Sequence, residues 1–175
     1  ARGCYPPASM PRVLGYWPSC PPRWPLAGST RRAAAAVADL LPAQPAALLD
    51  IGAGTGSLLR PLAPARPDCR FTGVELAPAT WLLGRLLAAR QPNIDCQRGD
   101  LFARPWQGYD IVYAFLSPVP MAAVWQKAAA ELRPGALLLS NSFPVPGGEP
   151  DFVVDVSDRR GTRLFGYRIP PRTPC

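Results

Sequence analysis

Three glycines at alternate positions follow an acidic residue in the stretch LLDIGAGTGSLL, which spans residues 48–59. The acidic residue is Asp50, and the glycines are Gly52, Gly54 and Gly56. Glycine loses more backbone freedom on folding than any other residue, so glycines clustered after an apolar run indicate that the backbone must bend sharply or approach a ligand closely. In an open parallel sheet, the bend after the first strand is a common ligand-binding position.

The spacing of these residues narrows the type of ligand. Dinucleotide-binding loops follow the pattern GxGxxG, with an acidic residue about 20 positions further on that binds a ribose. Glu75 lies at a comparable spacing, but the third glycine, Gly56, comes one place early, which argues against an NAD-dependent oxidoreductase. The phosphate-loop sequence GK[ST] does not occur in the chain. We therefore predict a loop for a nucleoside that has a ribose diol and no pyrophosphate.

Composition excludes several other kinds of chemistry. The sequence has 175 residues, 48% of them hydrophobic, which suits one domain, and no apolar run approaches the ~18 residues of a membrane span. Histidine is absent, so catalysis by Ser-His-Asp or Cys-His groups is excluded. The five cysteines form no CxxC pair, so no metal site is expected. The net charge is +7, but without a compact basic block it gives no reason to expect a nucleic-acid partner.

Apolar runs bounded by proline, glycine and polar residues predict the elements that position the loop. Strands are expected at 46–51, 71–76, within 93–101, at 109–116 and at 136–143, followed by a hairpin of 151–156 and 162–169. Helices are expected from a cap at Ser29 or Thr30 to Pro42, at 56–63 with Pro64 and Pro67 as its limits, at 78–91 and at 121–132.

Strands that alternate with helices predict an α/β fold, with a mostly parallel sheet, helices on both faces and an antiparallel hairpin at the C-terminal edge. We expect two parts. Residues 1–29 form a proline-rich and aromatic-rich N-terminal arm, and residues 30–175 form the α/β domain. A targeting segment or membrane anchor can precede residue 1, because the sequence does not begin with methionine.

Four short stretches, in order, resemble the motifs of class I S-adenosylmethionine-dependent methyltransferases: LLDIGAGTG, GVEL, RGDL and RPGALLLS. This resemblance implies a Rossmann-like sheet and S-adenosylmethionine as the cofactor. It assigns the methionine part and ribose to the loop of Asp50 and the glycines, the ribose hydroxyls to Glu75 and the adenine amine to Asp100. The complete implied cofactor set is Asp50, Gly52, Ala53, Gly54, Gly56, Glu75, Leu76, Asp100 and Leu101.

A narrower resemblance rests on ELAPATWLL, YAFLSPVPM, SNSFPVPG and TRLFGYRI. These stretches are similar to the lysine methyltransferases that modify the ATP synthase c-subunit and the adenine nucleotide translocase, and to their bacterial relatives. The glycine loop departs from that group, since GAGTG stands where GSGDG is more usual. The resemblance implies N-methylation of a protein lysine, with a membrane protein among the candidate substrates. It also implies a cytoplasmic protein that can associate with a membrane through an upstream segment.

The methyl acceptor is expected at the end of the strand 109–116, where the chain reads SPVP. Methyltransferases that act on nucleic-acid bases typically have [DN]PPY here, so base methylation is disfavoured. Ser117 is a candidate catalytic residue that accepts a hydrogen bond from an amine, or else it caps the following helix. Asn141 is a second candidate and, like Ser142, lines the same pocket or satisfies the backbone of the proline-rich loop after it.

Two other functions remain open at this point. One is methylation of a small metabolite, although the short loop PVPGGEPD leaves an open site that suits a protein chain better. The other is cofactor binding without catalysis. Intact acidic residues at positions 50, 75 and 100 argue against the second of these functions.

Overall fold

The computed structural model describes residues 26–158 and 160–171. In chain order its elements are α1 (Leu26–Leu40), β1 (Ala47–Ile51), α2 (Leu59–Ala65), β2 (Arg70–Glu75), α3 (Pro78–Ala88), β3 (Ile94–Arg98), β4 (Ile111–Ala114), α4 (Met121–Glu131), β5 (Leu137–Asn141), β6 (Phe152–Asp155) and β7 (Arg163–Arg168). The predicted N-terminal arm lies, up to residue 25, outside the described residues.

The strands form one seven-stranded sheet in the order β3-β2-β1-β4-β5-β7-β6. The first five pair in parallel, and β7 runs antiparallel to both β5 and β6. This confirms the predicted fold class. The winding direction reverses between β1 and β4, so the carboxyl ends of these two strands flank the position where open α/β sheets bind ligands.

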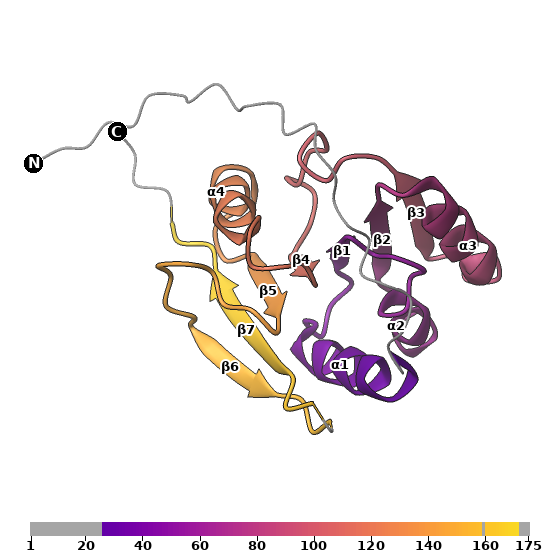
Figure 1. Ribbon diagram of the computed structural model, residues 1–175, viewed down its shortest axis with the longest axis horizontal. Helices are drawn as coiled ribbons and strands as arrows, with labels where there is room; N and C mark the ends of the chain where they lie inside the picture. The colour runs from indigo at the N-terminus through magenta and orange to yellow at the C-terminus, as the bar shows by residue number, and fades with distance from the viewer. Residues whose placement is uncertain (1–25, 159, 172–175) are drawn as a thin grey trace, which may run out of the picture.

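Helices cover both faces of the sheet (Figure 1). α1 and α2 pack on one face through a core that includes Val37, Leu59 and Leu62, and α4 packs on the other through Met121 and Val124. Successive side chains of the strands point alternately into the one core and into the other, because side chains of a strand alternate between the two faces of the sheet.

No helix lies between β3 and β4. The connection between these strands instead contributes one tryptophan to the core. Trp106 is fully buried beside α4. Its indole Nε1 donates to the Leu101 carbonyl at 3.2 Å, and its backbone N–H donates to the Glu131 carboxylate at 2.8 Å. The connection is therefore fixed to α4 by side chains rather than by a helix of its own.

Several predicted helix boundaries are wrong. α2 begins at Leu59 rather than at residue 56, and α3 ends at Ala88 rather than at residue 91. α1 begins at Leu26, so Ser29 and Thr30 lie inside the helix and do not cap it. α2 continues through Pro64 to Ala65. Proline cannot donate to the carbonyl four residues earlier, and here the side chain of Gln91 donates to the Arg60 carbonyl instead, at 2.8 Å.

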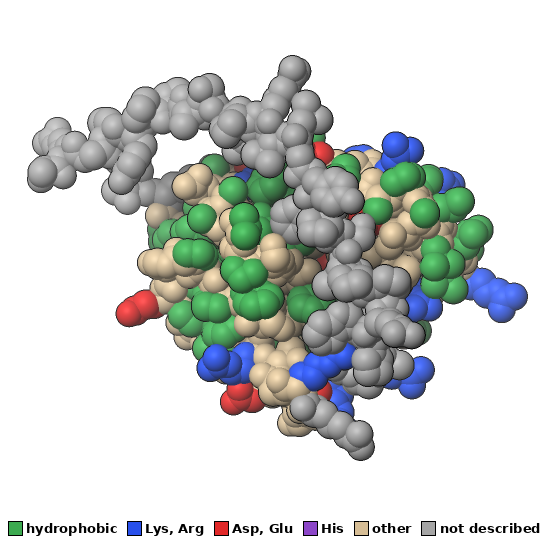
Figure 2. Space-filling view, viewed as in Figure 1, with side chains coloured by type: hydrophobic (Ala, Val, Ile, Leu, Met, Phe, Trp, Pro, Cys, Tyr) green, Lys and Arg blue, Asp and Glu red, His purple; other side chains and the backbone are tan. Residues whose placement is uncertain are grey.

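α3 carries small residues toward the sheet and large ones toward solvent. Gly84 and Ala88 are its buried residues, whereas the leucines at 82, 83, 86 and 87 are exposed. They contribute to the apolar surface seen over α3 at the right of Figure 2. None of the described helices is both long enough and apolar enough to cross a membrane.

Candidate active site

The glycine loop leaves β1 and turns toward the end of β2. The backbone N–H groups of Gly52 and Ala53 both donate to the Val74 carbonyl, at 2.9 and 3.0 Å. Gly52 and Gly54 have φ values of 78° and 57°, in the left-handed region that favours glycine. A Cβ atom at Gly52 would also lie 2.8 Å from the Leu116 Cδ2 atom. The loop therefore requires glycine both for its backbone angles and for its close contact with the end of β4.

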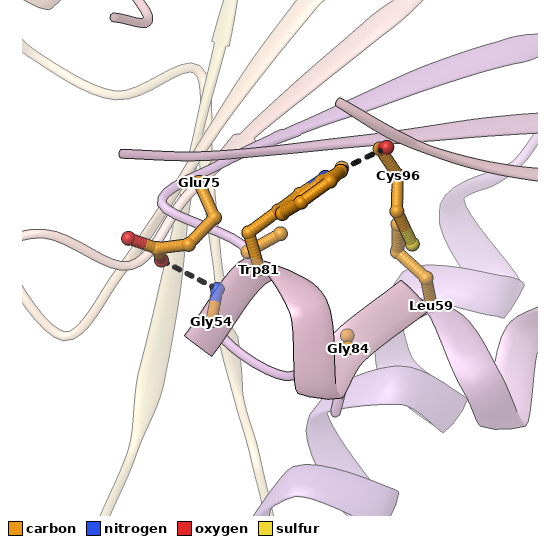
Figure 3. Close-up of a pocket in the computed structure, with 9 residues that line it drawn as sticks. Gly54, Leu59, Glu75, Trp81, Gly84 and Cys96 are labelled. Carbon is orange, nitrogen blue, oxygen red and sulfur yellow. Dashed lines mark hydrogen bonds between the residues drawn. The ribbon is translucent and has the colours of Figure 1, made fainter. Parts of the chain in front are cut away.

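Glu75 is fixed by two backbone donors at the end of β2. Its Oε2 atom accepts from the Gly54 N–H at 3.0 Å (Figure 3), and its Oε1 atom accepts from the Ala77 N–H at 2.8 Å. The carboxylate is half-buried. Loop and carboxylate thus hold each other in place before any ligand arrives, which lowers the cost of ordering them on binding.

Asp50 is a buried carboxylate without a hydrogen-bond donor among the described residues. It is only 3% exposed and lies beside Gly73 of β2 and Tyr113 of β4 in the sheet register. Burial, and then the negative charge of Glu75, raises the pKa of Asp50 to about 8. A buried carboxylate is costly unless a cation pairs with it. This position therefore fits a positively charged ligand such as S-adenosylmethionine.

A small cavity lies behind the loop, between α3 and the sheet, and Figure 3 shows its lining. Its volume is about 10 Å³, roughly the space of one water molecule. Trp81 closes it and donates from its indole Nε1 to the Cys96 carbonyl at 3.0 Å. A nucleoside is larger than this space. Trp81 packs α3 onto β3.

The structure brings the rest of the predicted cofactor set to the same end of the sheet. Ala53 packs against Gly73. A Cβ atom added at Gly73 would lie 2.9 Å from the Cβ atom of Ala53. Leu76 follows β2 and is exposed. Asp100 and Leu101 follow β3; the Asp100 carboxylate is exposed and accepts from the Phe102 N–H at 2.9 Å.

The two acceptor-site candidates differ in surroundings. Ser117 is exposed, and its side chain has no hydrogen-bond partner within the described part of the chain. It does not cap α4, because Pro120 occupies the cap position and makes no side-chain cap bond.

Asn141 is buried at the end of β5. Its Nδ2 donates to the Tyr113 hydroxyl at 2.5 Å, and its Oδ1 accepts from the Ser142 hydroxyl at 2.7 Å. It therefore serves other side chains and not the proline-rich loop. Sequence reasoning missed Tyr113, although the two-residue period of β4 places it on the same face as Asp50.

The described residues contain no group of three or more His, Cys, Asp or Glu side chains that could hold a metal ion. The seven-stranded sheet, with a glycine loop after β1 and carboxylates after β2 and β3, has the architecture of a class I S-adenosylmethionine-dependent methyltransferase. A family model, the ANTKMT methyltransferase domain, matches residues 50–152. The chain belongs to this family of methyltransferases.

Known proteins support this assignment. The adenine nucleotide translocase lysine N-methyltransferase of Mus musculus is 33% identical over 154 residues, which are 83% of this chain and 63% of the mouse protein. The chain thus spans less than two thirds of that relative.

Solved structures share the fold. An RNA methyltransferase from Salinibacter ruber in complex with S-adenosyl-L-homocysteine superposes with a TM-score of 0.72 and 23% identity, over 84% of this chain and 94% of that one. Aeropyrum pernix fibrillarin with bound S-adenosyl-L-methionine gives a TM-score of 0.60 and 21% identity, over 79% and 76%.

Proposed function

We propose that this protein transfers the methyl group of S-adenosylmethionine to the side-chain amine of a lysine in another protein, with membrane proteins as the first acceptors to test. The observation that carries this proposal is the match to the ANTKMT domain, together with the mouse lysine N-methyltransferase at 33% identity. The connection between β5 and β6, a short loop without a helix, supports an acceptor as large as a protein.

In this proposal each carboxylate meets a different part of the cofactor. Glu75 accepts hydrogen bonds from the ribose hydroxyls, and Asp100 accepts one from the adenine amine. Asp50 balances the positive charge of the methionine end. The backbone of Gly52, Gly54 and Gly56 allows close approach, and Ala53, Leu76 and Leu101 supply apolar contacts. The burial of Asp50 and the two backbone donors on Glu75 support these roles.

Methyl transfer depends mainly on how the protein aligns the amine with the methyl group. Bound S-adenosylmethionine supplies a methyl group that its sulfonium already activates. The protein must hold this group in line with an uncharged amine and exclude water, and good orientation alone can contribute about 7–11 kcal/mol. The absence of histidine from the sequence is compatible with such a reaction, because no strong base is needed once the amine is neutral.

The test uses S-adenosylmethionine labelled in its methyl group and a membrane-protein extract. We expect labelled methyl-lysine after hydrolysis of the proteins. Glu75→Ala should reduce the initial rate at low cofactor concentration by about tenfold or more, because the loop and the ribose site lose the same carboxylate. Asp39→Ala, which removes an exposed carboxylate from α1, is the matched control and should keep the wild-type rate.

Label that appears only in small molecules would favour the metabolite alternative. Wild-type protein that binds the cofactor and labels nothing would overturn the proposal.

A further inference from the structure

A polar pair lies on the face of the sheet that is otherwise covered by apolar side chains under α1 and α2. Tyr113 of β4 is 3% exposed and Asn141 of β5 is 5% exposed. Tyr113 stands opposite Leu139 in the register, so Asn141 lies two residues further toward the carboxyl end, on the same face. The proposed function uses neither the Tyr113 hydroxyl nor its partner.

The hydrogen bonds of this pair run in one direction. Ser142 donates its hydroxyl to Asn141 Oδ1, and Asn141 donates from Nδ2 to the Tyr113 oxygen. The Tyr113 hydroxyl keeps its own proton and a lone pair that no described residue uses. Ser142 has a φ of 73°, which is unusual for a residue other than glycine. Such backbone outliers concentrate at functional sites, and this one places the Ser142 hydroxyl against Asn141.

Apolar side chains surround the same end of the sheet. Phe115 and Val119 lie on the connection after β4, and Phe143 lies just after β5. All three are exposed, Val119 by 87%. The strands that precede these residues are neighbours in the sheet, since Ala114 pairs with Ser140. A lysine side chain has matching parts, with four methylene groups that suit an apolar rim and an amine that suits a polar floor.

We infer that the Tyr113 hydroxyl, held by Asn141, binds the ε-amine of the acceptor lysine, and that Phe115 and Phe143 contact its methylene chain. This inference rests on the proposed function and deepens it. A neutral oxygen accepts an N–H of the amine without the strong preference for the ammonium form that a carboxylate has. Burial and the nearby charge of Asp50 raise the pKa of Tyr113, so this hydroxyl stays neutral at physiological pH.

The transfer step balances within this arrangement. The nitrogen lone pair forms the N–C bond while the C–S bond breaks, and the electrons of that bond remain on sulfur, which becomes a neutral thioether. The methylated nitrogen then carries the positive charge and releases a proton to water. The role of Tyr113 is to aim the lone pair at the methyl group through the N–H that it binds.

Tyr113→Phe tests the inference, because it keeps the ring and removes only the hydroxyl. The control is Tyr167→Phe. Tyr167 is equally buried, its hydroxyl accepts from the Val145 N–H at 2.8 Å, and it lies in the core with α4. We expect Tyr113→Phe to bind S-adenosylmethionine within about twofold of wild type by calorimetry and to lose about tenfold in kcat/KM for the lysine acceptor, the order of one neutral hydrogen bond. Tyr167→Phe should keep the wild-type kcat/KM.

Phe143→Ala is a second variant, at a surface position that is 38% exposed. We expect it to raise KM for the acceptor severalfold while kcat stays unchanged. The inference is overturned if folded Tyr113→Phe matches wild type, or if it loses as much cofactor affinity as acceptor kcat/KM. Wild-type protein that forms no methyl-lysine overturns the proposed function and the inference together, whereas methyl-lysine formed equally by wild type and all three variants overturns the inference alone.

Discussion

Two aspartates at opposite ends of the parallel strands show how surroundings decide what a carboxylate does. Asp110 precedes β4, accepts from the Ala47 N–H at 2.8 Å and pairs with Arg133. Asp50 lies near the carboxyl end of β1 and has no donor among the described residues. The first carboxylate is satisfied by the fold. The second has no such partner, and in the proposed function it meets the positive charge of the cofactor.

This difference predicts opposite effects of two matched substitutions. The pKa of Asp50 in the fold, about 8, lies above its ordinary value of 3.8, so its stabilising contribution is present below pH 4 and is lost as pH rises to 8. Asp50→Asn removes this penalty and should raise the melting temperature of the cofactor-free protein by about 3 °C or more at pH 8, with a smaller gain at pH 5.

Thermal unfolding at both pH values, followed by circular dichroism, measures this difference. Asp110→Asn should lower the melting temperature at both pH values, because it weakens a satisfied carboxylate. An Asp50→Asn gain that is equal at pH 5 and pH 8 would contradict the role of ionisation.

Residue types and spacing predicted the glycine loop and the carboxylates near the carboxyl ends of β1, β2 and β3, because each belongs to a short local pattern. Tyr113 could not be predicted in the same way. In the run YDIVYAFL it reads as an ordinary strand residue. Its partner Asn141 is 28 positions away in the sequence, and only the pairing of β4 with β5 brings the two together.

Helix α3 can lie close to the glycine loop because residue 84, on the side of α3 that faces the loop, is a glycine. A Cβ atom at Gly84 would lie 3.1 Å from the Gly54 carbonyl oxygen and 3.2 Å from backbone atoms of Thr55. Replacing glycine with alanine inside a helix usually stabilises a protein by up to about 1 kcal/mol. Here the added methyl group meets backbone that cannot move without displacing the loop.

We therefore expect Gly84→Ala to lower the free energy of unfolding by about 1–3 kcal/mol and to weaken S-adenosylmethionine binding. Urea unfolding and calorimetry measure the two effects. Gly108→Ala is the matched control, because an added Cβ atom there has only one neighbour, the Arg70 guanidinium at 4.0 Å. If the two variants have equal unfolding free energies and equal cofactor affinities, α3 accommodates the added methyl group without displacing the loop.

Near the other edge of the sheet, an aromatic ring covers a glycine. Phe152 of β6 pairs with Gly166 of β7, and a Cβ atom at Gly166 would lie 2.2 Å from the Phe152 ring. An aromatic side chain laid over a cross-strand glycine shields the backbone that glycine leaves bare.

Gly166→Ala should push this ring away and destabilise the protein by about 1–2 kcal/mol. In the Phe152→Ala background the same substitution should cost much less, because the methyl group no longer meets the ring. A double-mutant cycle by urea unfolding measures the coupling between the two residues. Additive effects would mean that the ring adjusts freely at this edge.

Element types were predictable because strands and helices differ in the period of their apolar residues. The exact end of α2 was not, because it depends on a proline whose effect is decided by tertiary contacts. Pro64 reads as a helix limit, yet the Gln91 side chain, 27 positions later in the sequence than Pro64, satisfies the carbonyl that proline leaves free. Local sequence cannot show such a distant donor.

For the whole molecule, alternation of strands and helices predicted the parallel sheet, and the terminal hairpin predicted its antiparallel edge. The insertion of β7 between β5 and β6 places the two kinds of pairing side by side. β1 and β4 have neighbours on both sides and are buried on both faces, whereas β6 pairs with β7 alone.

The rates of amide hydrogen exchange should differ between the central strands and the edge strand. We expect the slowest exchange in β1 and β4, at rates set by global unfolding, and faster exchange in β6 through local opening. Mass spectrometry of peptides from the exchanged protein measures it. Protection of β6 equal to that of β4 would show that the sheet opens only as one unit.

The place of β7 has a consequence for biosynthesis. A ribosome produces β6 before β7, yet in the finished sheet β6 pairs only with the strand that is made after it. Until that later segment emerges, the backbone of β6 has no strand to pair with, and the outer side of β5 stays open to strands of other nascent chains. Translation speed through residues 152–168 therefore sets how long this edge is vulnerable to mispairing.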